Sequence, residues 1–575
     1  MRLSYGSIEK DCGSESFILS NRAGGFCCFG IDSRYRGVFF NVAGRLLKVI
    51  DDISLAAPID GIRNNLWDVE RQRGSVKETF FMPVNSGCLV YELSEETQAS
   101  LLLDVREPYD NREWGRNYSF VDAKDALVIK YSKFFDSRDS DLDDGMEYSV
   151  FIAVIADSFS NIGVWRQQDY GFDRHRNSPN SRYVYHAADL GGKRIIFSVA
   201  GSAARAILQA KKFSAKSDSP RTDAGKLDEA GLAYQCACQS LDSLTLRQPG
   251  ILAGLPWFFQ VWMRDEAVCL KSLLLRQKYS LVKKILLREL SDLASGVHSR
   301  GVRQIDSLGW HFKRWDDLIH ALLTKKLLKK YLPKREIIQL AFQLKHCLDI
   351  HSSSIRDGFV ANMPKETWMD SIDRSGARLE LQALQLAAHR LMHTLSGDPA
   401  EKRKEMDLKS RVRSMFFRDG YLWDSPDDPT IRPNIFVAAY VYPNLLEQGE
   451  WVRCFEIVLP RLWLGWGGLA SIDTSSQFFC ATHTGENPRS YHNGDSWFWI
   501  NNCAALVLHG IDKDRFSHYV DSIFRASTRE ILWSGSSGNH SELSSACELK
   551  SEGCLSQAWS SAMYVELVHA LGGLA

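Results

Sequence analysis

The sequence lacks a net charge, and this absence excludes several classes of partner. Lysine plus arginine and aspartate plus glutamate both number 70 in 575 residues. A chain without a net electrostatic field does not attract nucleic acid, an anionic membrane or a polyanionic ligand. The charge balance therefore favours a neutral substrate and predicts neither a nucleic-acid partner nor a membrane partner.

Long apolar runs and paired metal ligands are also missing. No stretch holds the roughly 18 consecutive apolar residues of a membrane span, and the first residues lack the apolar core of a signal peptide. The thirteen cysteines form no CxxC pair and have no histidines at zinc-ligand spacing. We therefore expect reduced thiols, no metal, no cofactor and a cytoplasmic location; no feature indicates an oligomeric state.

The first part of the chain has the pattern of short strands. Its apolar runs, such as 37–42 and 194–199, are β-branched or aromatic and are separated by Gly, Asn, Asp and Ser. This pattern is typical of antiparallel strands, so residues 1–215 predict an N-terminal β-sandwich domain. Residues 136–144 predict an exposed loop, and residues 216–230 predict a linker.

Residues 231–575 change to a helical period. The segment 316–331 places leucines and an isoleucine on one stripe with lysines opposite, which is typical of an amphipathic helix. Similar stripes begin near residues 265, 279, 336, 378, 451, 496, 513 and 555. Successive helices, joined by Gly- and Trp-rich connections without a fixed repeat, favour a closed ring of paired helices with an active site at one end.

Two carboxyl-bearing segments indicate glycosidic bond cleavage. This chemistry needs one carboxylic acid that protonates the leaving oxygen and one carboxylate that activates water. Asp370 is the predicted acid, because a carboxyl group beside Trp368 in a partly apolar pocket has a raised pKa; Glu366 is the second choice. Glu542, flanked by hydrogen-bond donors, is the predicted base. The local alternatives are a helix cap for Asp370 and a solvated loop residue for Glu542.

Other segments supply candidate sugar contacts. Trp262 can pack on a sugar ring while Arg264 donates to its hydroxyl groups and Asp265 accepts from them, although a helix cap is the alternative for this dipeptide. Glu380 begins a helix and can supply pocket hydrogen bonds or cap that helix. His492 and Asn493 lie in a loop rich in aromatic residues, where a histidine is assigned to binding and not to catalysis.

Taken in order, these segments resemble the amylo-α-1,6-glucosidase family, the glycogen-debranching glucosidases. Five features agree with the family pattern: Pro256-Trp-Phe followed by Trp262-x-Arg264-Asp265, Thr367-Trp-Met-Asp370, Glu380-x-Gln382-Ala-Leu, Tyr491-His-Asn-Gly494-x-x-Trp497, and Ser541-Glu542 before Gly553-Cys-x-x-Gln557-Ala-Trp559. Residues 305–310, 432–434 and 20–38 are similar to three further family segments. Two positions differ from the pattern, since Met263 replaces a customary glycine and Arg36 a customary histidine.

The resemblance implies a β-sandwich joined to a catalytic (α/α)6 toroid and an inverting hydrolase. It implies Asp370 as acid and Glu542 as base, without a cofactor, and about 6.5–9.5 Å between the two carboxyl groups. The implied substrate is a branched α-glucan or malto-oligosaccharide with α-1,6-linked glucosyl stubs, as in glycogen or limit dextrin. The predicted substrate-binding residues are Trp262, Arg264, Asp265, Trp368, Glu380, His492, Asn493, Gln557 and Trp559.

Two alternatives to this function stay open. One is another inverting glucosidase on the same toroid, of the glucoamylase or trehalase type, because Trp-x-Arg-Asp also resembles glucoamylases. The other is a non-catalytic glycogen-binding protein that keeps the pocket without the chemistry.

Overall fold

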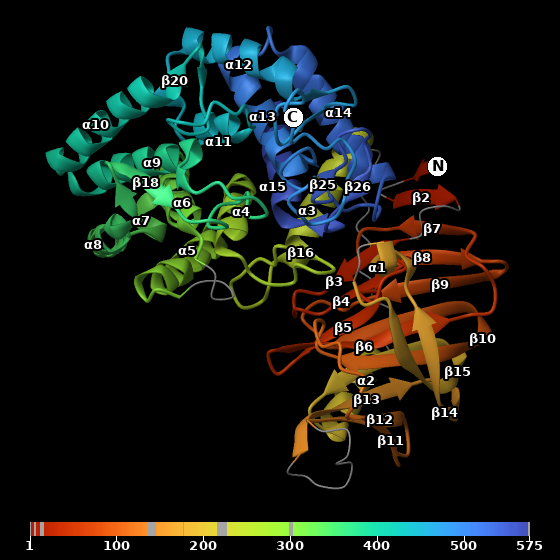
Figure 1. Ribbon diagram of the computed structural model, residues 1–575. Helices are drawn as coiled ribbons and strands as arrows, with labels where there is room; N and C mark the ends of the chain where they lie inside the picture. The colour runs from red at the N-terminus through yellow and green to blue at the C-terminus, as the bar shows by residue number, and fades with distance from the viewer. Residues whose placement is uncertain are drawn as a thin grey trace.

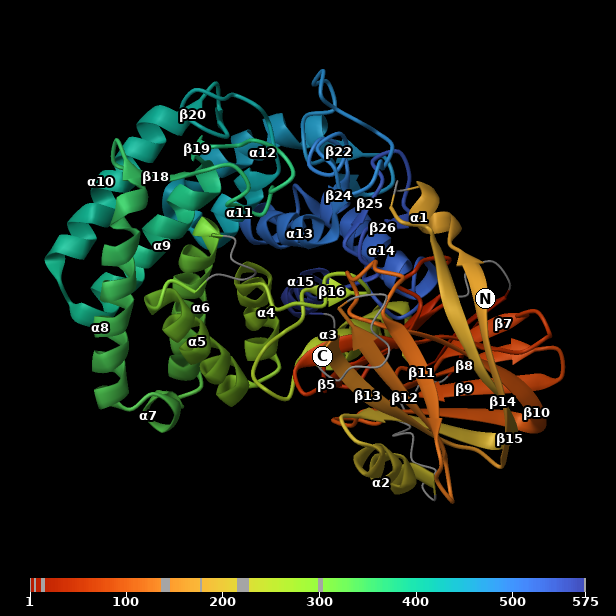
Figure 2. The same cartoon turned by 60° about the horizontal axis from the view of Figure 1, so that its bottom comes forward.

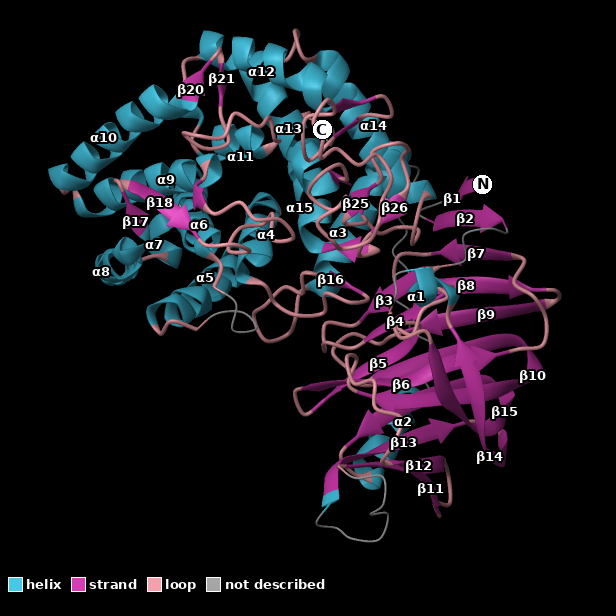
Figure 3. Cartoon of the chain, in the orientation of Figure 1, coloured by secondary structure: helices cyan, strands magenta, loops and turns pink. Residues whose placement is uncertain are grey.

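The computed structural model describes residues 2–4, 7–11, 16–135, 145–175, 178–214, 227–297 and 303–572. The predicted loop 136–144 and residues 216–226 of the predicted linker lie outside these ranges. Strands dominate the chain as far as Ala200, and helices dominate from Glu229 onward. The two kinds of structure are separated in space as well as in sequence (Figures 1 and 3).

The first region is built from antiparallel strands that join into one branched sheet. The strands are β1 (Arg2–Ser4), β2 (Ser7–Asp11), β3 (Phe17–Ser20), β4 (Phe26–Phe29), β5 (Gly37–Val42), β6 (Arg45–Ser54), β7 (Gly61–Asn64), β8 (Asp68–Arg73), β9 (Val76–Phe81), β10 (Cys88–Arg106), β11 (Arg116–Val121), β12 (Leu127–Phe134), β13 (Met146–Ile155), β14 (Ser158–Asp169) and β15 (Ser181–Ala200). Two short helices, α1 (Gly171–His175) and α2 (Ala203–Ser214), accompany them.

Two long strands give this sheet its branched shape. Strand β10 pairs with β9 through residues 90–93 and with β6 through residues 100–106, so it passes from one layer to the other. Strand β15 pairs with β14 through residues 181–191 and with β13 through residues 196–200, so it also passes between the two layers. A buried apolar core lies between the layers. The predicted β fold class is confirmed, and the term sandwich is approximate because the two layers share strands.

Strands β3 and β4 are apolar on both faces because they lie between two cores. Phe17 and Cys27 face the core inside the sheet, whereas Ile18, Phe26 and Cys28 belong to the core of the helical region. Side chains alternate between the two faces of a strand, so the run Phe26–Phe29 supplies both cores. This double burial attaches the β region to the helices.

Twelve helices of eight or more residues follow in the part of the second region that the structure describes. They are α3 (Glu229–Leu244), α4 (Met263–Leu275), α5 (Tyr279–Ala294), α6 (Ile305–Thr324), α8 (Lys334–His351), α9 (Leu379–Ser396), α10 (Pro399–Phe416), α11 (Asn434–Val441), α12 (Gln448–Leu462), α13 (Phe498–Asp512), α14 (Ser517–Trp533) and α15 (Ala558–Ala570), with the single turn α7 (Leu328–Tyr331) between α6 and α8.

Six of these helices form a closed inner ring. Helix α4 contacts α6, and the contacts continue through α9, α11, α13 and α15, which returns to α4. The remaining six helices, α3, α5, α8, α10, α12 and α14, alternate with them along the chain and pack around them (Figure 2). The ring of paired helices predicted from the sequence is therefore confirmed.

Helices α3, α10 and α11 were not predicted from the sequence, and the last two have a clear physical reason. Helix α10 is rich in Lys, Arg and Glu and buries a thin stripe of side chains, and α11 is apolar on every side, so neither shows a clear period of 3.6. The predicted helix 316–331 is not continuous, because α6 ends at Thr324 and Lys326 adopts a left-handed conformation before α7. Among the described residues, no helix has the length and apolar character needed to cross a membrane.

Candidate active site

A cavity of about 550 Å³ opens at the end of the ring where the inner helices begin. Its lining comes from four connections that lead into inner helices, 245–262, 352–378, 463–497 and 534–557, and from the first residues of α4 and α15. The lining residues are Ala253, Phe258, Trp262, Arg264, Asp265, Lys365, Trp368, Asp370, Ser371, Glu486, Pro488, Tyr491, Trp497, Glu542, Gln557 and Trp559. Its volume suits a small-molecule site.

Short strand pairs fix these connections to one another. Strand β16 (Gly254–Leu255) pairs with β27 (Ser556–Gln557), and β24 (Ser496–Trp497) pairs with β25 (Leu543–Ser544), which also pairs with β26 (Ser551–Glu552). A Cβ atom at Gly254 would lie 2.0 Å from Gln557 Oε1, so only glycine allows this approach. The connections 245–262 and 463–497 are therefore both joined to the connection 534–557.

The start of α4 brings Trp262, Arg264 and Asp265 to the cavity. Trp262 occupies the N-cap position, which makes the helix-cap alternative for Asp265 wrong. Arg264 Nε donates to Asp265 Oδ2 at 3.2 Å, and its guanidinium lies 5.7 Å from the ring centre of Trp559. The adjacent Met263, which departs from the family pattern, is buried in the helical core and does not line the cavity.

Asp370 lies in a turn of the connection 352–378, nine positions before α9 begins at Leu379, and Arg378 occupies the N-cap position, so a helix cap is wrong here as well. Burial raises the pKa of Asp370 to about 6, although the nearby Arg264 opposes the shift. Glu366, the alternative acid, does not line the cavity; it accepts a hydrogen bond from the Met363 N–H at 2.7 Å. Of these two carboxyl groups, Asp370 is the one at the cavity.

Glu542 is 2% exposed and accepts two hydrogen bonds, so the solvated-loop alternative is wrong. Tyr491 Oη donates to Oε1 at 2.6 Å and the Cys554 N–H donates to Oε2 at 3.0 Å. Gly553 has a φ of +66°, and a Cβ there would lie 2.3 Å from Oε2. Burial and the nearby Glu486 raise the pKa of Glu542 to about 8, which differs from the ionised carboxylate expected from the sequence.

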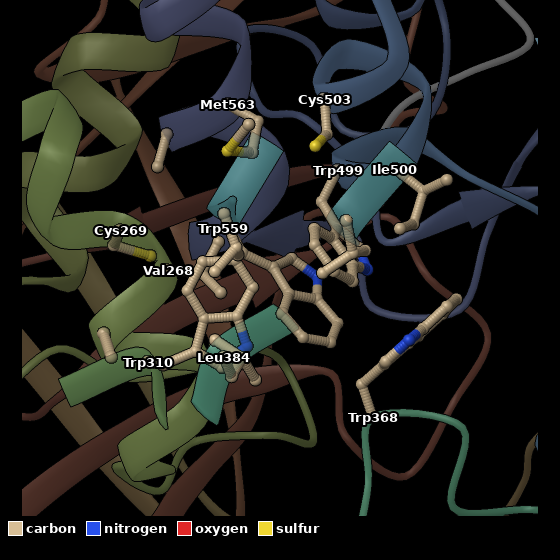
Figure 4. Packing of buried hydrophobic residues seen from close by; sticks show 14 of the residues in the cluster. Val268, Cys269, Trp310, Trp368, Leu384, Trp499, Ile500, Cys503, Trp559 and Met563 are labelled. Carbon is tan, nitrogen blue, oxygen red and sulfur yellow. The ribbon is translucent and has the colours of Figure 1, made fainter. Parts of the chain in front are cut away.

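Tryptophan side chains pack against one another beside the cavity (Figure 4), and Trp368 and Trp559 also line it. Trp559 stacks on Trp499 with 4.9 Å between ring centres, and Trp368 meets Trp499 edge to face at 5.1 Å. Trp368 Nε1 donates to Asn434 Oδ1 at 2.8 Å, which fixes the ring. Flat aromatic faces of this kind pack against apolar ligand surfaces.

Three predicted substrate-binding residues, Glu380, His492 and Asn493, do not line the cavity. Glu380 is fully buried in a bidentate ion pair with Arg374. His492 is also buried: its Nδ1 lies 2.6 Å from Ser371 Oγ and its ring stacks on Trp497. Asn493 accepts from Arg432 and donates to the Pro488 carbonyl. All three hold loops that do reach the cavity.

Arg374 belongs to a buried network that fixes the loop of Asp370. It pairs with both Glu380 and Asp424, at 2.8 Å and 2.7 Å. Asp424 also accepts from Asn434, the residue that holds Trp368. A charge taken out of water needs partners of this kind, so the network both satisfies its own charges and positions the turn that contains Asp370.

Three ionisable residues of the cavity, Lys365, Glu486 and Tyr491, had no role in the sequence analysis. Tyr491 stood in a quoted motif, but its hydrogen bond to Glu542 depends on folding across 51 positions. Glu486 and Lys365 have the sequence context of ordinary surface residues, and both line the cavity. Within the described ranges, no group of three or more His, Cys, Asp or Glu side chains is arranged to hold a metal ion.

Comparison with known proteins agrees with this architecture. The family model described as amylo-alpha-1,6-glucosidase matches residues 230–566, more than half of the chain. A bacterial glucoamylase solved in complex with acarbose has a similar structure, with a TM-score of 0.63 and 11% identity, over 98% of this chain and 94% of that chain. At this identity the likeness concerns the fold, and it extends over both regions.

Two further solved structures match a smaller part of the chain. A glycosidase in complex with glucose has a TM-score of 0.44 and 13% identity over 61% of this chain and 100% of that chain. A mannosylglycerate hydrolase from Thermus thermophilus has a TM-score of 0.43 and 13% identity over 58% of this chain and 99% of that chain. No curated protein matches the sequence.

Proposed function

The chain belongs to the amylo-alpha-1,6-glucosidase family, a family of glycoside hydrolases, and from this premise we propose that it removes α-1,6-linked glucosyl stubs from a branched α-glucan with inversion. The observation that supports the proposal most is the presence of Asp370 and Glu542 in the lining of one cavity. Hydrolysis with inversion needs two carboxyl groups that reach one sugar from opposite sides.

Polar and aromatic side chains of the cavity lining support a hydroxyl-rich ligand. Arg264, Asp265 and Gln557 line the cavity together with Trp262, Trp368 and Trp559. Sugar hydroxyl groups can form hydrogen bonds with the polar side chains, while the ring of the sugar packs on tryptophan.

In the proposed mechanism Asp370 protonates the bridging oxygen as its bond to C1 breaks. Glu542 takes a proton from water, which attacks C1 from the opposite face. An α-linked glucosyl group is therefore released as β-glucose. The reaction uses the two carboxyl groups and one water molecule.

The function is tested by incubating the purified protein with branched limit dextrin and following the anomeric form of the glucose released. We expect β-glucose first, with α-glucose appearing only by mutarotation. Linear maltodextrin and trehalose serve as comparison substrates. Faster glucose release from either of them would contradict the α-1,6 preference and favour a glucoamylase or trehalase type, and initial α-glucose would contradict inversion.

The raised pKa values predict the pH profile of kcat/KM, which reports the ionisation of the free enzyme. The active form has Asp370 protonated and Glu542 ionised, whereas their pKa values of about 6 and about 8 make this form a minority near neutral pH. At pH values below about 6 the activity decreases because Glu542 is protonated. At pH values above about 8 it decreases because Asp370 is ionised. We expect a bell-shaped profile with limbs near these two values.

Two variants with opposite effects identify which limb belongs to Glu542. Tyr491→Phe removes the hydroxyl that donates to the carboxylate, so the pKa of Glu542 should rise. Glu486→Gln removes a neighbouring negative charge, so the pKa of Glu542 should fall. The limb of the profile near pH 8 should therefore shift to higher pH in Tyr491→Phe and to lower pH in Glu486→Gln. Movement of the other limb, or of neither, would contradict the assignment.

A further inference from the structure

Aromatic side chains from the β region meet the loop that forms one wall of the cavity. Phe172, in α1, stacks on Trp257 with 5.9 Å between ring centres, and Tyr109 lies 5.2 Å from Phe259. Tyr109 Oη also donates to the Trp257 carbonyl at 2.8 Å. Helix α1 lies on the side of the β region that faces the helices (Figure 2). The two regions therefore build one aromatic surface together.

This surface is open to solvent on its outer side. Tyr109 is 43% exposed and Phe172 is 37% exposed, Phe259 is half-buried, and Trp257 beneath them is buried. Apolar residues scattered singly over a surface need no explanation, but a contiguous exposed group indicates an interaction site. We call Tyr109, Phe172 and Phe259 the entrance shelf.

The entrance shelf adjoins the loop that lines the cavity. Phe258, between Trp257 and Phe259 in the sequence, lines the cavity together with Trp262. The stretch Trp257–Phe259 thus supplies a side chain to the cavity on one side and to the shelf on the other. The shelf therefore lies next to the lining residue Phe258 along this loop.

We propose that the entrance shelf binds the leaving glucan chain, so that the β region helps to select polymeric over small substrates. The inference rests on the proposed function, in which a single glucosyl stub occupies the cavity and the rest of the polymer stays outside it. The C–H faces of glucose rings pack on flat aromatic rings, and the Tyr109 hydroxyl adds a polar group at the same place. A small leaving group ends before it reaches the shelf.

The test compares two substrates in one variant. Phe172→Leu/Phe259→Leu keeps apolar bulk beneath the surface but removes two aromatic faces. The measurement is the ratio of kcat/KM for branched limit dextrin to kcat/KM for isomaltose, a disaccharide with the same linkage. We expect the ratio to fall about tenfold, the size expected from losing two aromatic contacts. Phe342→Leu, at an exposed aromatic residue on the outer helix α8, is the matched control and should leave the ratio unchanged.

Each other outcome has a distinct meaning. If both substrates lose activity equally, the aromatic residues only support the wall of the cavity, and the inference is overturned. An unchanged ratio with full activity overturns it as well, because the leaving chain then gains nothing from the shelf. Failure of the wild-type protein to release glucose from either substrate rejects the proposed function itself, which separates the two hypotheses.

Discussion

Asp370→Asn should lower glucose release from branched limit dextrin by about 10²- to 10⁴-fold, the usual contribution of a general acid. The amide keeps the size of the carboxyl group but has no proton to give to the leaving oxygen. Asp370 lines the cavity beside Trp368, and burial raises its pKa to about 6, which keeps part of the population protonated near neutral pH. The bridging oxygen would then have to leave as an alkoxide.

The size of the loss should depend on the leaving group. A glucoside of an acidic phenol needs little proton donation, so the variant should hydrolyse it with a much smaller loss than it shows on dextrin. Glu366→Gln is the control in the same loop, since Glu366 does not line the cavity. Equal loss on both substrates, or full activity on dextrin, would reject Asp370 as the acid, and an unchanged circular dichroism spectrum excludes unfolding as the cause.

The architecture could be predicted because local patterns determine it. Short β-branched and aromatic runs separated by turn residues predicted the strands, and the period of 3.6 predicted most helices of the ring. The double burial of Phe26–Phe29 was not predictable from the run itself, because it depends on the helical core that packs on the outer face of β3 and β4. The end of α6 at Thr324 was not predictable either. The apolar stripe of the sequence continues past this point, whereas Lys326 adopts a left-handed conformation that ends the helix.

The site was predicted where a side chain follows directly from its motif. Trp262, Arg264 and Asp265 reach the cavity because all three stand at the beginning of one helix. Glu380 and His492 stand in equally distinctive motifs but point into buried networks. A motif alone does not separate a residue that touches a ligand from a residue that holds its neighbour, because both are polar, buried and fixed in geometry.

The raised pKa of Glu542 is the clearest difference between sequence and structure. Donors next to it in the sequence predicted an ionised carboxylate, yet burial outweighs the hydrogen bonds from Tyr491 and Cys554. Glu486, 56 residues away in the chain, adds to the shift because folding brings its charge near Glu542. Long-range burial and charge of this kind are not visible in a local segment.

Glu542→Gln should abolish hydrolysis as strongly as loss of the acid, by about 10²- to 10⁴-fold, but with a different dependence on the leaving group. The amide retains a hydrogen bond from the Cys554 N–H and cannot accept a proton from water. Because attack of water is impaired for every substrate, dextrin and an activated aryl glucoside should lose activity equally. Glu552→Gln, on the neighbouring strand β26 and paired with Lys550, is the matched control.

A smaller side chain allows a direct test of the face from which attack occurs. In Glu542→Ala the space of the carboxyl group can admit azide, an anion that attacks without losing a proton. Its nitrogen would bond to C1 from the face opposite the bridging oxygen while Asp370 protonates the leaving group, so the expected product is β-glucosyl azide. Product analysis distinguishes the outcomes: an α-azide would place the nucleophile on the wrong face, and rescue in Asp370→Asn but not in Glu542→Ala would exchange the roles of the two carboxyl groups.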